Sequence, residues 1–111
     1  MSDAKIIDEA ILGDLIEHIG AEAVQSIIEI FLGECRELIA TIGAATTPQV
    51  AGRAAHSLKS SAGQLGAIAL AEAALAVETA AESGSPALPA LAAALLACAA
   101  QTETALAGRL Q

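Results

Sequence analysis

His56 is the residue of this chain whose chemistry and surroundings are most informative. In a helix, at about 100° per residue, its face would carry only small neighbours: Gly52, Ser60 and Gly63. Arg53 lies three residues before His56 and Lys59 three residues after it, so two cations flank this face. A neutral imidazole is a competent nucleophile near pH 7, because the ordinary pKa of histidine is about 6.5. The pattern predicts a histidine that is presented to a large partner and is not buried in a core.

Composition and spacing predict the helices that must hold this histidine. The chain is rich in alanine and leucine, with one Phe and no Trp or Tyr, and alanine has the highest helix propensity. We therefore expect an all-α protein with helices over about residues 6–18, 21–42, 48–65, 67–83 and 86–109. Thr47-Pro48 and Ser85-Pro86 are typical of helix starts, and glycines 20, 43 and 66 of helix ends or bends. Short connections favour an antiparallel up-down-up-down four-helix bundle, with the short first helix across one end.

Charge and composition limit the classes of partner. The 111 residues carry a net charge of −8, which disfavours nucleic acid and anionic membrane surfaces. Residues 83–102 carry no charge, but two prolines and many alanines favour a helix of the bundle over a membrane span. The charged N-terminus does not resemble a secretory signal, so we expect a cytoplasmic protein. Cys35 and Cys98 are expected to be free thiols in apolar surroundings.

The run from Ala55 to Ala67, AHSLKSSAGQLGA, resembles the signature of histidine-containing phosphotransfer (HPt) domains, roughly A-H-x-L-K-G-S-A-x-x-L-G-A. The acidic first helix, the Phe-containing second helix and the Leu/Ala/Glu-rich helix after Gly66 follow the order of that family. The resemblance covers nearly the whole chain, so we expect one HPt-like helical domain over residues 1–111. One departure is Ser60, where the family usually has glycine; serine is small enough to leave His56 exposed, and its hydroxyl could touch a phosphoryl group.

The resemblance implies a phosphoryl carrier in a His–Asp phosphorelay. His56 would take a phosphoryl group from a receiver-domain aspartate or a sensor histidine kinase and pass it to another receiver domain. Such domains bind no ATP, no small-molecule substrate, no cofactor and no metal of their own, since the Mg²⁺ belongs to the receiver. Lys59 and Arg53 could reach the phosphoryl oxygens, and Ser60 and Gly63 would leave room for the receiver.

The family often has Glu or Gln beside the imidazole, twenty-two residues after the histidine, and this chain has Glu78 there. A carboxylate that accepts a hydrogen bond from one ring nitrogen would leave the other nitrogen free to attack. Apolar residues of the second helix, such as Ile28 and Leu32, are candidates for a docking surface around His56.

The sequence is also compatible with two other classes of function. The bundle could dock receiver or kinase domains without carrying phosphate, in which case a stable complex would form without acid-labile phosphate. An enzyme is the third possibility, but the chain lacks a glycine-rich nucleotide loop, a supported nucleophile–base pattern and a His/Cys metal cluster. We therefore expect a carrier without kinase activity of its own.

Overall fold

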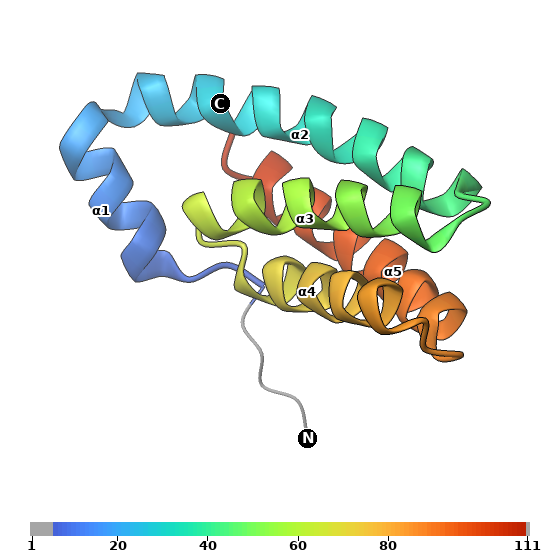
Figure 1. The fold of residues 1–111 in the computed structure, drawn as a ribbon. Coiled ribbons are helices and arrows are strands. Elements are labelled where there is room, and N and C mark those ends of the chain that lie inside the picture. The colour runs from blue at the N-terminus through green and yellow to red at the C-terminus, as the bar shows by residue number, and fades with distance from the viewer. Residues whose placement is uncertain (1–5, 111) are drawn as a thin grey trace.

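The computed structural model describes residues 6–110, which form an all-α fold (Figure 1). Its helices are α1 (Glu9–Ile19), α2 (Ala21–Ala44), α3 (Pro48–Gln64), α4 (Ile68–Ser83) and α5 (Leu88–Ala107). Helices α2 to α5 form a four-helix bundle in which α3 contacts α2 and α4, and α5 contacts α4 and α2. Helix α1 packs on α2 across the end of the bundle where α3 passes into α4 (Figure 1). The predicted fold class and architecture are confirmed.

The helix ends follow from local hydrogen bonds. The Thr47 hydroxyl accepts a hydrogen bond from the Val50 N–H at 3.3 Å, with Pro48 in the first turn of α3. Gly84 ends α4 in the left-handed conformation, with φ of 65°, which glycine adopts without steric cost. Helix α5 begins at Leu88, two residues later than predicted, because residues 85–87 form a turn in which the Ser85 hydroxyl accepts from the Ala87 N–H at 3.1 Å.

Leucines, isoleucines and alanines fill the core. Its largest fully buried side chains are Ile28, Leu58, Leu65, Leu70, Leu95 and Leu106. The faces of α3 and α4 also carry small buried residues, namely Ala51, Ala54, Ala55 and Ala62 on α3 and Ala74 and Ala80 on α4. Small side chains let two helix axes approach closely, and these two helices share the most extensive contact of the bundle. The helix that carries His56 is therefore packed closely against the helix that carries Glu78.

The two cysteines are free thiols, as predicted. Cys35 is fully buried in α2, and burial raises the pKa of its thiol to about 11. Cys98 of α5 is partly buried, and its pKa is also raised, mainly by desolvation. Both behave as small apolar residues of the core, because a thiol of high pKa is a poor nucleophile at neutral pH.

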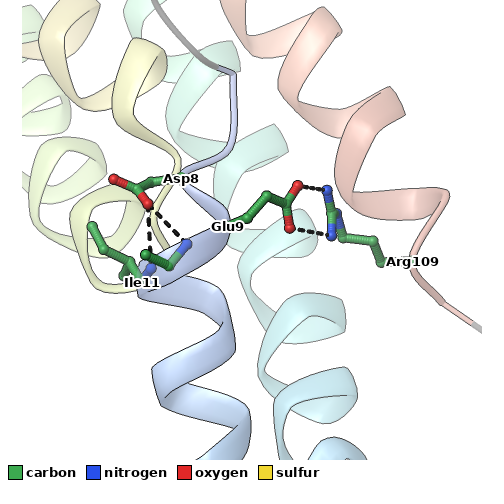
Figure 2. Close-up of polar contacts among 5 residues, drawn as sticks. Asp8, Glu9, Ile11 and Arg109 are labelled. Carbon is green, nitrogen blue, oxygen red and sulfur yellow. Dashed lines mark hydrogen bonds and ion pairs between the residues drawn. The ribbon is translucent and has the colours of Figure 1, made fainter.

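The start of α1 is attached to two distant parts of the chain. The Asp8 carboxylate accepts hydrogen bonds from the N–H groups of Ala10 and Ile11, and Glu9 forms an ion pair with Arg109 near the C-terminus (Figure 2). The Asp8 N–H donates to the carbonyl of Gly66 at 2.7 Å. These contacts hold α1 over the turn that connects α3 to α4.

Helix α5 is long and apolar enough to cross a membrane by length and composition alone. Its buried residues Leu95, Ala99, Thr102 and Leu106 face the bundle. We therefore interpret α5 as a core helix of the bundle.

Candidate functional site

His56 projects outward from the middle of α3. Its side chain is 59% exposed, while its neighbours Ala55 and Leu58 are fully buried. This contrast follows from the helical repeat, which turns residues 55 and 58 toward the core when residue 56 faces solvent. An incoming protein can therefore reach the imidazole without any rearrangement of the bundle.

Glu78 of α4 fixes the orientation of the imidazole. Its Oε2 atom lies 2.7 Å from Nδ1 of His56, and its side chain is only 15% exposed. A hydrogen bond from Lys59 and then one from His56 hold the pKa of Glu78 below its ordinary value. The carboxylate is therefore ionised at neutral pH and can only accept a hydrogen bond. Nδ1 must carry the proton, so in the neutral ring Nε2 keeps a free lone pair.

Lys59 binds the other oxygen of the same carboxylate. Its Nζ atom lies 2.8 Å from Oε1 of Glu78, and its side chain is 31% exposed. An ammonium group has three N–H donors, so the bond to Glu78 leaves donors for a further acceptor. One carboxylate thus connects the imidazole to a cation, and the structure brings together three residues singled out from the sequence: His56, Lys59 and Glu78.

The small residues of the histidine face have two different surroundings. A Cβ atom added to Gly63 would meet nothing within 4 Å, and Ser60 is exposed. Because both residues are small, no bulky side chain stands beside His56 on this part of α3. A Cβ atom added to Gly52 would instead lie 3.1 Å from the Cβ of Ala81 in α4. Gly52 is thus a contact point between two helices, which the spacing of small residues alone did not reveal.

Arg53 lies on the other flank of His56 and is exposed. The other arginines and the lysine between residues 6 and 110 form ion pairs, whereas Arg53 forms none within that range. Arg53 borders a groove of about 480 Å³ between α3 and α4, which is lined by Pro48, Gln49, Gly52, Arg53, His56, Glu78, Ala81 and Glu82. A free guanidinium at the edge of this groove is available to an anionic group brought by a partner.

The apolar surface of α2 differs from the prediction. Ile28 and Leu32 are buried, with 2% and 7% exposure, so neither belongs to a docking surface. The large apolar residues that α2 exposes are Ile27 and Ile30, and Ile30 is 64% exposed. They line a hollow of about 150 Å³ with other residues that include Ser61 and Gln64 of α3. This apolar surface therefore adjoins the C-terminal part of the helix that carries His56.

Comparison with known proteins identifies the family. Residues 26–107 match the family model of the Hpt domain. The chain also superposes on the crystal structure of histidine-containing phosphotransfer protein B (HptB) from Pseudomonas aeruginosa PAO1 with a TM-score of 0.88. That alignment covers 96% of this chain and 95% of the other at 23% sequence identity. No curated protein sequence matches the chain.

The match to the family model includes the helices that carry His56, Lys59 and Glu78, and extends over most of the chain. The chain belongs to the Hpt domain family. It is a phosphotransfer protein of phosphorelays, in which such domains exchange phosphoryl groups with receiver or kinase domains.

Proposed function

We propose that His56 carries the phosphoryl group and that Nε2 is the atom that binds it. The observation that supports this assignment is the 2.7 Å contact between Nδ1 and Glu78 on a ring that is 59% exposed. This contact occupies one ring nitrogen and leaves the lone pair of the other for attack on phosphorus.

The transfer step follows from that arrangement. The Nε2 lone pair forms an N–P bond while the P–O bond of a receiver aspartyl phosphate breaks, and the bonding electrons leave with the aspartate carboxylate. The proton on Nδ1 stays in its hydrogen bond to Glu78 throughout. The negative charge of Glu78 offsets the positive charge that the ring gains when Nε2 is phosphorylated. Transfer to a second receiver reverses the same step.

Two cations support the phosphoryl group in this proposal. Lys59 keeps one hydrogen bond to Glu78 and offers its remaining donors to the phosphoryl oxygens. Arg53 binds the phosphoryl group from the opposite flank or attracts the acidic pocket of a receiver toward an otherwise acidic protein. Both positions are three residues from His56 on the same helix.

The partner surface surrounds His56. Ser60 and Gly63 leave room for the rim of a receiver domain, and the exposed Ile27 and Ile30 offer it an apolar contact. An in-line transfer needs the aspartate and the imidazole on opposite sides of phosphorus, so a bulky residue beside His56 would keep the partner too far away. We propose that the partners are receiver domains, a sensor kinase or both, and that the protein works in the cytoplasm as a single carrier domain without kinase activity.

Labelling with radioactive phosphate tests the site. Purified receiver domains that carry a labelled aspartyl phosphate, or a labelled sensor kinase, would be mixed with the wild type and with His56→Ala. We expect label on the wild type and none on the variant. His18→Ala is the matched control, because His18 lies on α1 and its ring nitrogen Nδ1 contacts the carbonyl of Asp14 at 2.7 Å.

Undiminished label on His56→Ala would refute the assignment of His56. A stable complex between the wild type and a receiver that never yields acid-labile phosphate would instead support a binding module without phosphotransfer. Loss of label in both histidine variants would indicate damage to the fold, which circular dichroism would report separately.

A further inference from the structure

Gly52 faces Ala81 across the interface between α3 and α4, with no room between them for an added side chain. A Cβ atom added to Gly52 would lie 3.1 Å from the Cβ of Ala81, whereas ordinary van der Waals contact begins at 3.4 Å. Glycine lowers helix propensity in a helix interior, and Gly52 has no positive φ that would require it. The close approach of α4 is the feature of the structure that an alanine at this position would disturb.

This contact lies next to the hydrogen bond that orients His56. Gly52 is one turn before His56 on α3, and Ala81 is three residues after Glu78 on α4. The two helices run in opposite directions, so the close contact and the hydrogen bond are neighbours along the interface. Both pairs of residues line the same groove. The spacing between the helices at Gly52 therefore limits how closely Glu78 can approach the imidazole.

We propose that Gly52 is a positioning residue for phosphotransfer, an inference that rests on the function proposed for His56. The absence of a side chain at Gly52 lets α4 approach α3 closely enough for Glu78 to reach both Nδ1 of His56 and Nζ of Lys59. A methyl group there forces a local shift of a few tenths of an ångström. The bond to His56 is 2.7 Å long, so a shift of this size weakens it, and the Nδ1–H tautomer loses part of its advantage.

The variant Gly52→Ala tests this role in the isolated protein. ¹⁵N NMR of the imidazole at pH 8 measures the ratio of Nδ1–H to Nε2–H tautomers without any phosphate donor. We expect the Nδ1–H tautomer to predominate in the wild type and the ratio to fall about three-fold in Gly52→Ala, as partial loss of a hydrogen bond to a charged group allows. The rate of His56 labelling should fall by a similar factor.

Two further variants separate positioning from general effects. Gly13→Ala in α1 adds the same methyl group where nothing lies within 4 Å, so its tautomer ratio should equal that of the wild type. The double variant Gly52→Ala/Ala81→Gly moves the methyl group from one helix to the other and should restore the ratio. This rescue also answers the case in which Gly52→Ala alone does not fold.

A wild-type tautomer ratio in folded Gly52→Ala would overturn the inference, and so would failure of the double variant to restore the ratio. A slower labelling rate with an unchanged tautomer ratio would also count against positioning. The methyl group would then act on docking of the partner at the groove between α3 and α4, and not on the imidazole. If the wild type accepts no label while the ratio responds as expected, the proposed phosphotransfer function fails and the structural link between Gly52 and His56 stands.

Discussion

Gly66, in the L-G-A run at residues 65–67, lies where the start of α1 is attached to the turn between α3 and α4. The substitution Gly66→Ala measures how much this contact contributes to stability. Gly66 has a φ of +79°, which is disfavoured for residues with a side chain. A Cβ atom there would lie 2.9 Å from the carbonyl oxygen of Asp8 and 3.1 Å from the Cβ of Ile11. The carbonyl of Gly66 also accepts the 2.7 Å hydrogen bond from the Asp8 N–H. The methyl group therefore pushes away the segment that attaches α1.

The cost can be worked out from these contacts. The left-handed backbone costs an alanine about 1–2 kcal/mol relative to glycine. Displacing Asp8 weakens a backbone hydrogen bond worth about 1 kcal/mol. We expect Gly66→Ala to lower the free energy of unfolding by about 2–3 kcal/mol, measured by urea denaturation. Hydrogen exchange should show the largest loss of protection in α1.

Gly84→Ala is the matched control. Gly84 has a similar φ of +65°, but a Cβ atom there would meet nothing within 4 Å. This variant should lose only the backbone part, about 1–2 kcal/mol. If Gly66→Ala costs no more than Gly84→Ala, the close contact with Asp8 does not matter. If folded Gly66→Ala accepts phosphate at His56 far more slowly than the wild type, the role of the glycine is not confined to the attachment of α1.

Three further predictions concern the site. Lys59→Met keeps the length of the side chain but removes its charge, so the fold should persist while phosphotransfer slows about ten-fold; an unchanged rate would remove Lys59 from the mechanism. Ser60→Leu places a bulky group beside His56 and should slow transfer from a receiver about ten-fold or more; full activity would argue against close docking at this face. Hydrogen bonds from Lys59 and then from His56 lower the pKa of Glu78 in the folded protein. The ionised carboxylate therefore contributes its full stabilisation above its ordinary pKa of about 4.3, and this contribution is lost as the pH falls through the lower folded pKa. Urea denaturation as a function of pH should therefore show less acid destabilisation in Glu78→Gln than in the wild type between the ordinary pKa and the folded pKa of Glu78. Identical pH profiles would contradict the ion-pair geometry.

Most of the fold could be predicted from the sequence because its signals are local. Alanine and leucine favour helices throughout, and Thr47-Pro48, Gly20 and Gly66 mark helix boundaries. Gly43 does not end its helix as predicted, because α2 continues through it to Ala44. The start of α5 differs because Ser85 forms a local turn, so the Ser85-Pro86 pair precedes the helix and does not begin it. The ion pair between Glu9 and Arg109 joins the two ends of the chain, and no local pattern indicates such a contact.

The site could be predicted in part. The spacing around His56 indicates an exposed imidazole, and the family resemblance indicates Glu78, but only the register of α3 against α4 shows which atoms meet. Ile28 and Leu32 were poor candidates for docking because apolar residues at 27, 28 and 30–32 leave the rotation of α2 about its axis undecided. The contact of Gly52 with Ala81 depends on the distance between two helix axes, which is a property of the packed bundle.

The most direct test of the account is to identify the phosphorylated atom. The wild type, labelled with ¹⁵N in its histidine rings, would be phosphorylated by a receiver or kinase and examined by ¹⁵N and ³¹P NMR. We expect phosphorus bound to Nε2 of His56, with the proton retained on Nδ1. Phosphorus on Nδ1, which Glu78 contacts at 2.7 Å, or on any other residue would contradict the assignment of Nε2 of His56 as the phosphorylated atom.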